Sequence, residues 1–215
     1  MILYFVKRTV RKYQSKADWR DITKVRRGFE RLIARFEKLS KRCLYEPVQI
    51  GTMTALWIVP KKQPDTQGVL LYFHGGGYAT GSANTHRGHI AQIVKKSGVR
   101  ALLINYRLAP ENPYPAAIED ATAAYQWLME QGYKSEQIAF GGDSAGGGLT
   151  IGSMLYIRDN NIALPKCAIA MSPWLDLTLT GSSMTNPTTK EPMLVREAMP
   201  LWASNYLNGT DPRNP

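Results

Sequence analysis

One serine stands between small residues in a segment suited to nucleophilic chemistry. The segment reads Gly142-Asp143-Ser144-Ala145-Gly146 and joins an apolar run to a helical pattern. A nucleophilic serine must stand clear of the backbone on a sharp turn, and small residues two positions before and after it let strand and helix approach each other. A phosphate-binding loop would need a lysine beside the serine, which this segment lacks. We therefore expect Ser144 to be a nucleophile and Asp143 to cap or orient the turn.

A second segment could supply hydrogen-bond donors to the same reaction. His74-Gly75-Gly76-Gly77 ends an earlier apolar run. Consecutive glycines lose much backbone entropy on folding, and they suit places where main-chain N–H groups converge on a ligand. Ala145 opens a predicted helix, so its N–H has no partner within that helix. These N–H groups would bind the oxyanion of acyl transfer, where one donor typically lowers the barrier by about 3 to 4 kcal/mol.

The surrounding pattern predicts an α/β fold. Two segments, 44–50 and 53–60, are typical of a β-hairpin. Short apolar runs then alternate with helical patterns, which indicates parallel strands covered on both faces. The runs are 69–73, 101–106, 137–140 and 167–171, and the helical patterns are 86–97, 116–131 and 145–158. Ligands bind at the carboxyl ends of such strands, where both candidate segments lie.

The net charge of +10 is concentrated at the amino terminus. Residues 1–45 contain 14 Lys and Arg against four Asp and Glu, and the remaining basic and acidic residues balance. Apolar residues from Trp19 to Leu39 recur at helical spacing, so we expect an amphipathic helix that docks on the protein with its charges in solvent. The alternative is a basic surface for an anionic partner such as nucleic acid or a membrane.

Composition also bears on compartment and cofactors. Cys43 and Cys167 cannot form a disulfide framework, which favours a reducing compartment. No apolar run approaches the roughly 20 residues that span a bilayer, so we expect a cytoplasmic protein without stable membrane insertion. His86 and His89 form an H-x-x-H pair without a third ligand or nearby carboxylate. We expect no metal and no cofactor.

Three stretches resemble the hormone-sensitive-lipase-like branch of the α/β-hydrolase superfamily, which includes bacterial carboxylesterases. They are HGGGYATGS at 74–82, YRLAPENPYPAAIEDA at 106–121 and GGDSAGGGL at 141–149. The resemblance implies an α/β-hydrolase fold: a mostly parallel sheet with helices on both faces (46–177) and a helical cap from 1–45 and 178–215. It also implies hydrolysis of short- to medium-chain acyl esters without a cofactor.

The same resemblance implies roles for individual residues. Ser144 would be the nucleophile, with Gly76, Gly77 and Ala145 as oxyanion donors, and His74 would support the glycine loop. We expect Tyr78, beside these glycines, to line the substrate pocket. Charged residues of the second stretch, Arg107, Glu111 and Asp120, favour a structural network over substrate contact.

The sequence departs from the pattern of this family in two catalytic residues, the histidine that serves as general base and the acid that pairs with it. The superfamily order is serine, acid, histidine, yet all three histidines (His74, His86 and His89) precede Ser144. The later acids are Asp159, Asp176, Glu191, Glu197 and Asp211, and none follows a predicted seventh strand. We expect a sheet that stops after its sixth strand, in the amino-terminal part of a longer hydrolase that is nearly inactive as given.

Several partners are compatible with this interpretation. We expect a small-molecule ester substrate and no nucleic acid. A homodimer, or a second chain that carries the missing carboxyl-terminal part, would be a protein partner. The alternative function is a catalytically dead, receptor-like relative that binds a small molecule with the same fold.

Overall fold

The computed structural model describes residues 18–34, 38–62, 67–186 and 194–213. Parts of the predicted amino-terminal cap (1–17 and 35–37) and Glu191 lie outside these ranges. The elements in chain order are α2 (Ile22–Ala34), β1 (Cys43–Ile50), β2 (Met53–Pro60), β3 (Val69–Phe73), α3 (Ala83–Ser97), β4 (Arg100–Ile104), α4 (Ala116–Glu130), η1 (Ser135–Gln137), β5 (Ile138–Asp143), α5 (Ala145–Asp159), β6 (Cys167–Met171), α6 (Ser182–Thr185) and α7 (Ala198–Leu207).

The strands form one six-stranded sheet in the order β1-β2-β4-β3-β5-β6. The predicted hairpin is present, since β1 and β2 pair antiparallel. Strand β2 also runs antiparallel to β4, whereas β4, β3, β5 and β6 are parallel to one another. The carboxyl ends of β3 and β5 therefore meet at one edge, which brings the glycine loop beside the turn that carries Ser144.

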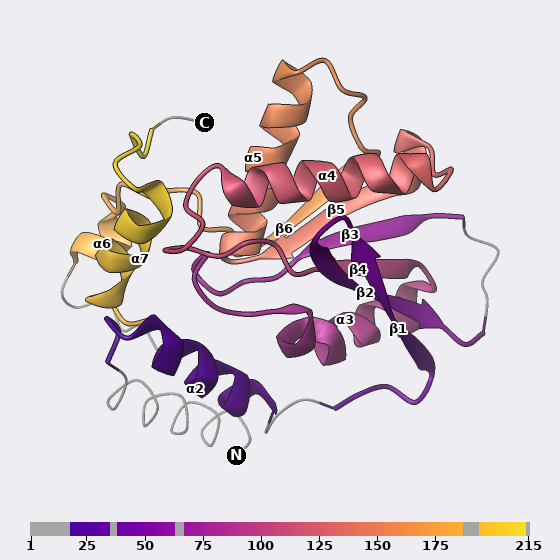
Figure 1. Ribbon diagram of the computed structural model, residues 1–215, viewed down its shortest axis with the longest axis horizontal. Coiled ribbons are helices and arrows are strands. Elements are labelled where there is room, and N and C mark those ends of the chain that lie inside the picture. Colours follow the sequence, from indigo (N-terminus) through magenta and orange to yellow (C-terminus); the bar gives the residue numbers. More distant parts are fainter. Residues whose placement is uncertain (1–17, 35–37, 63–66, 187–193, 214–215) are drawn as a thin grey trace.

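Helices cover the sheet from both sides (Figure 1). On one face, α4 and α5 enclose a core in which Phe140 lies edge-on to both Phe73 and Tyr125. On the other face, Ile90 and Val94 of α3 pack in a second apolar cluster. The unbroken apolar runs of β3 and β4 follow from this double coverage. The predicted fold class is confirmed.

Strand β6 forms the edge of the sheet within the described residues. It pairs with β5 alone. Its Ile169 side chain is 53% exposed, and Cys167 is exposed as well. An exposed strand edge with apolar side chains is a surface that proteins normally cover. This edge agrees with the expectation of a sheet that stops at its sixth strand.

Helix α2 docks on the protein through charged groups as well as through an apolar stripe. Val25 and Leu32 are buried. Arg26 donates hydrogen bonds to the carbonyl oxygens of Ala79 (2.7 Å) and Ala109 (2.8 Å) and pairs with Glu111 (2.7 Å). The expectation that the charges of this helix lie in solvent is therefore wrong for Arg26. Its guanidinium connects the segment after the glycine loop to the loop after β4.

We expect Arg26→Ala to lower the free energy of unfolding by about 2 kcal/mol, because two partly buried carbonyls lose their donor. Arg27, the next residue, is exposed and makes a matched control. Its Ala variant should change stability by less than about 0.5 kcal/mol. Urea denaturation of both variants gives the comparison. Equal stability would mean that the Arg26 contacts contribute nothing.

No helix in the described ranges is long and apolar enough to cross a membrane. The cytoplasmic location and the division into core and cap stay predictions.

Candidate active site

Ser144 occupies the sharp turn between β5 and α5. Its φ of 54° and ψ of −120° lie outside the regions that non-glycine residues favour. The turn is held by three backbone hydrogen bonds. The Ser144 N–H donates to the carbonyl of Met171 (3.0 Å), and the Ser144 carbonyl accepts from the N–H groups of Gly148 (3.0 Å) and Trp174 (2.9 Å). Ser144 is partly exposed, so its hydroxyl is accessible at the head of the helix.

Close packing explains the two glycines of this turn. A methyl group on Gly146 would overlap the carbonyl oxygen of Phe73, at the end of β3. A methyl group on Gly142 would overlap the carbonyl oxygen of Gly146. Helix α5 therefore starts directly against the backbone of the neighbouring strand. This contact fixes Ser144 relative to the glycine loop.

The glycine loop adopts backbone conformations that side chains disfavour. Gly76 has a φ of 132° and Gly77 a φ of 63°. A side chain at Gly77 would also overlap the ring of Trp202, which packs on it from α7. Within the described part of the chain, the N–H groups of Gly76, Gly77 and Ala145 have no hydrogen-bond acceptor.

Ser144 borders two cavities. One, of about 380 Å³, is lined by Gly77, Ser144 and Trp202, together with residues from the segment after β6. The other, of about 790 Å³, is lined by His86, Asp143 and Ser144, with Met171 at the end of β6. A carbonyl group in the first cavity would have Ser144 and Gly77 of the glycine loop as neighbours.

His74 lies buried beneath the glycine loop. Its ring stacks on Tyr106 with centroids 4.3 Å apart, and its Nδ1 donates to the carbonyl of Gly75 (2.9 Å). Burial, followed by the nearby charge of His86, lowers the pKa of His74 to about 3. A neutral imidazole therefore contacts the glycine loop from below, and the supporting role of His74 stays a prediction.

The burial of His74 predicts a pH dependence of stability. An unfolded histidine binds its proton near pH 6.5, whereas folded His74 stays neutral down to about pH 3. Neutral His74 therefore contributes to the free energy of unfolding in full above pH 6.5, and this contribution is lost as the pH falls toward 3. It amounts to at most about 5 kcal/mol. His74→Asn should remove this part of the slope in urea denaturation across that range. An unchanged slope would contradict the buried neutral state.

Asp143 joins the turn to the glycine loop. Its Oδ1 accepts hydrogen bonds from the Gly75 N–H (3.1 Å) and the Tyr72 hydroxyl (2.7 Å), and it lies 3.3 Å from Nε2 of His86. Burial alone would raise the pKa of Asp143, but the hydrogen bond and charge of His86, with the other donors, hold it below its ordinary value. Asp143 therefore orients the loop as well as the turn.

His86 lies at the site, although the sequence pattern indicates no role for it there. The H-x-x-H pair of His86 and His89 has no carboxylate near it in the sequence, yet Asp143 of β5 lies beside His86 in the structure. His89, one turn further along α3, is exposed. A histidine five residues after the loop glycine Gly81 is the available signal, and helical periodicity alone indicates no partner for it.

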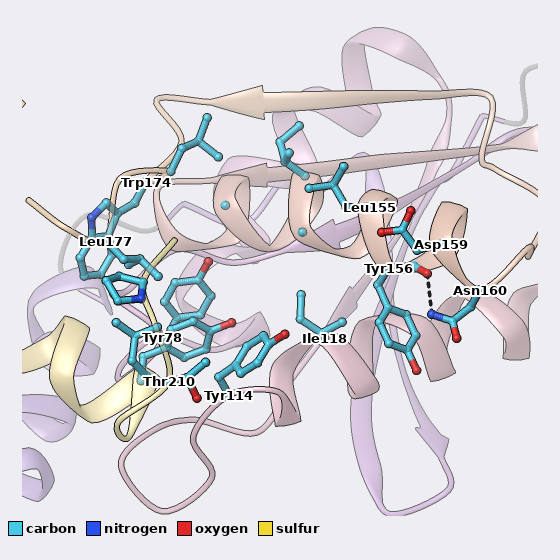
Figure 2. A pocket seen from close by; sticks show the side chains of 17 residues that line it. Tyr78, Tyr114, Ile118, Leu155, Tyr156, Asp159, Asn160, Trp174, Leu177 and Thr210 are labelled. Carbon is cyan, nitrogen blue, oxygen red and sulfur yellow. Dashed lines mark hydrogen bonds between the residues drawn. The ribbon is translucent and has the colours of Figure 1, made fainter. Parts of the chain in front are cut away.

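Tyr78 lies in the wall of a separate cavity along α5, of about 220 Å³. Figure 2 shows it there with Tyr114 and Trp174. Its ring stacks on Tyr206 with centroids 3.7 Å apart. The cavities lined by Ser144 do not include Tyr78 among the described residues, although Trp174 borders both this cavity and the one beside Gly77. Contact between Tyr78 and substrate stays a prediction.

The charged residues of the 106–121 stretch pair with protein groups. Arg107 bonds to both Asp120 (2.9 Å) and Glu119 (2.7 Å), and Glu111 pairs with Arg26. This is the structural network that the sequence favours.

Three of the acids after Ser144 are bonded to groups near them in the sequence. Asp176 lines the cavity beside Gly77, but its carboxylate accepts hydrogen bonds from its own loop, from Thr178 and Gly181 among others. Asp159 pairs with Arg158, and Asp211 with Arg213. In the described ranges, the turn and the glycine loop therefore come together without an acid–histidine pair that follows Ser144.

Comparison with known proteins connects this arrangement to esterases. The family model of the alpha/beta hydrolase fold matches residues 70–215. An acetyl-hydrolase of Streptomyces hygroscopicus is 42% identical over 168 residues, which cover 78% of this chain and 56% of that protein. An esterase of Acinetobacter venetianus is 35% identical over 147 residues, 68% of this chain and 48% of that protein.

Solved structures agree in fold. The crystal structure of an esterase from the bacterial hormone-sensitive lipase family superposes with a TM-score of 0.92 at 36% identity. The match covers 99% of this chain and 71% of that chain.

Human hormone-sensitive lipase is 28% identical in sequence over 155 residues, 70% of this chain and 14% of that protein. The chain spans about half the length of the bacterial relatives that it matches.

Proposed function

Because this chain belongs to the alpha/beta hydrolase family, in its hormone-sensitive-lipase-like branch, we propose that it carries the nucleophile and the oxyanion-binding part of a serine carboxylic-ester hydrolase. The substrates are esters of short- to medium-chain acids. One observation carries the proposal: Ser144 sits in a sharp turn of positive φ at the head of α5 and borders one cavity together with Gly77 of the glycine loop. The relatives named acetyl-hydrolase and esterase support this substrate class.

The proposed reaction is acyl transfer through Ser144. A base removes the hydroxyl proton, Oγ attacks the ester carbonyl carbon, and the carbonyl oxygen becomes an oxyanion. The N–H groups of Gly76, Gly77 and Ala145 donate to that oxyanion, collapse expels the alcohol, and water then releases the acid. The lack of other acceptors for these three N–H groups among the described residues supports this role.

We propose that the base and the acid come from residues outside this sequence, either along a longer chain or from a second polypeptide. All histidines of the sequence precede Ser144. His74 is buried and bonded to Gly75, and Nε2 of His86 lies 3.3 Å from the carboxylate of Asp143. Without a base, a serine hydroxyl is a poor nucleophile, and loss of one triad member typically costs roughly 10⁴ to 10⁶ in rate. The 215-residue chain alone is then nearly inactive.

A chimera tests the proposal. It continues this chain with the corresponding carboxyl-terminal part of the Streptomyces acetyl-hydrolase, and p-nitrophenyl esters of increasing acyl length serve as substrates. We expect turnover in the chimera to exceed that of the 215-residue chain by about 10⁴-fold or more, highest for short acyl groups. A folded chimera that binds a non-hydrolysable ester analogue without turnover would instead support the receptor-like alternative. Comparable fast turnover by the 215-residue chain would mean that its own residues supply the base.

A further inference from the structure

His86 reaches the turn before Ser144 from a separate element, the opening turn of α3. Its Nε2 lies 3.3 Å from Oδ1 of Asp143, and its side chain is 13% exposed. A carboxylate only accepts hydrogen bonds, so in any hydrogen bond between these two groups Nε2 must be the donor. We propose that His86 is a positioning residue: by donating to Asp143 it holds the Gly75 peptide, and with it the N–H groups of Gly76 and Gly77, beside Ser144. The catalytic consequence of this role rests on the proposed function.

The Asp143 carboxylate belongs to the turn and is also in contact with the glycine loop. The Gly75 N–H donates to the same oxygen, Oδ1, that faces His86, and the Tyr72 hydroxyl donates to it from β3. The loop also rests on the second oxygen, because a methyl group on Gly75 would overlap Oδ2. The orientation of this carboxylate therefore decides whether the Gly75 N–H keeps its hydrogen bond.

His86 is itself fixed before it meets Asp143. Its Nδ1 lies 2.8 Å from the Thr85 hydroxyl, which belongs to the capping box that Ser82 forms at the start of α3. Its ring lies against those of His74 and Tyr72, with centroid distances of 5.6 and 6.5 Å. The start of α3 thus fixes the position of Nε2. Nε2 in turn helps to fix the orientation of the Asp143 carboxylate.

Other contacts hold the loop on either side of this point. The Gly76 carbonyl accepts from the N–H of Thr80 (2.9 Å), and the Tyr78 carbonyl accepts from the N–H of Ala109 (2.8 Å). On the other side, the Tyr106 hydroxyl donates to the carbonyl of His74 (2.6 Å). The only hydrogen bond that the Gly75 N–H makes within the described residues goes to Asp143. Loss of the His86 donor should therefore loosen the loop locally and leave the fold intact.

Amide hydrogen exchange by NMR on the 215-residue chain tests this role without any need for turnover. A hydrogen bond to a charged group contributes enough free energy to change an equilibrium constant, here that of local opening, about tenfold. We expect His86→Ala to raise the exchange rate of the Gly75 amide by about that factor. His89→Ala, on the same helix and in the wall of the same cavity, should leave it at the wild-type rate. His86→Gln, which keeps a donor at a similar position, should restore protection.

Two outcomes would overturn the proposal. One is equal Gly75 exchange in His86→Ala and His89→Ala. The other is a His86→Gln variant as unprotected as His86→Ala, which would mean that the donated hydrogen bond is irrelevant. If His86→Ala fails to fold, His86→Phe keeps the ring and removes the donor, and the same rise in exchange is expected of it.

The catalytic consequence is measured separately in the chimera. There His86→Ala should lower kcat by about tenfold with little change in KM, because oxyanion donors act in the transition state. If the chimera has no turnover at all, the proposed function fails while the exchange result stands. If the exchange is unaffected, the positioning role fails while the hydrolase proposal stands.

Discussion

Ser144→Ala in the chimera is expected to slow ester hydrolysis by roughly 10⁴ to 10⁶, since the reaction loses its nucleophile. The structure favours this serine because hydrogen bonds to Met171, Gly148 and Trp174 hold its backbone in the sharp turn of positive φ. A residual rate above that of water should remain, because the N–H groups of the glycine loop still bind the oxyanion. Initial rates with p-nitrophenyl acetate give the ratio.

Ser172 provides the matched control for this substitution. It borders both of the cavities that Ser144 borders, but it follows β6 and does not open a helix. Ser172→Ala should keep most of the activity. If Ser144→Ala retains activity, or if Ser172→Ala removes it to the same extent, the nucleophile has been assigned to the wrong residue.

Gly146→Ala is expected to lower the free energy of unfolding by about 3 kcal/mol or more. Its added methyl group would overlap the carbonyl oxygens of Phe73 and His74, and backbone atoms cannot move away by changing rotamer. Urea denaturation followed by circular dichroism measures the loss. The same substitution should also shift Ser144 away from the glycine loop, because α5 would have to move.

Gly152 on the same helix is the control for this effect. A methyl group there would meet only the terminal Cδ1 of Ile118, a flexible side chain, at 3.0 Å. Alanine also has a higher helix propensity than glycine, by about 1 kcal/mol. We therefore expect Gly152→Ala to be close to neutral. If the two variants are equally stable, the close approach of α5 to β3 does not constrain the turn.

The elements that position the site could be predicted because their signals are local. The runs 69–73 and 167–171 coincide with β3 and β6. Strand β3 is buried along its whole length, which explains its unbroken apolar sequence, whereas β6 has the same kind of sequence although it lies exposed at the edge of the sheet. The start of α3 was placed three residues late, because its capping box uses Thr85 in place of the usual Glu or Gln. Strand β5 extends to Asp143 because it pairs with β6 as far as Met171, a register that the sequence does not encode locally.

The contacts that tie the site together could not be predicted, because they join distant segments. Arg26 was assigned to a solvated face from helical periodicity, yet its acceptors are carbonyl groups of two loops far along the chain. The sequence indicates no partner for His86 because the carboxylate beside it belongs to Asp143 of β5, more than 50 residues further along the chain. Hydrophobic periodicity shows which face of a helix or strand is apolar. It carries no information on which polar group of another segment will contact a given polar side chain.

The most direct test of the central claim is the site of covalent modification by a fluorophosphonate. The chimera is labelled, digested and analysed by mass spectrometry, with the Streptomyces acetyl-hydrolase treated in parallel. We predict a single adduct on the peptide that contains Ser144, and none in the Ser144→Ala variant. An adduct on a different residue, or an unmodified Ser144 under conditions that label the relative, would contradict the account.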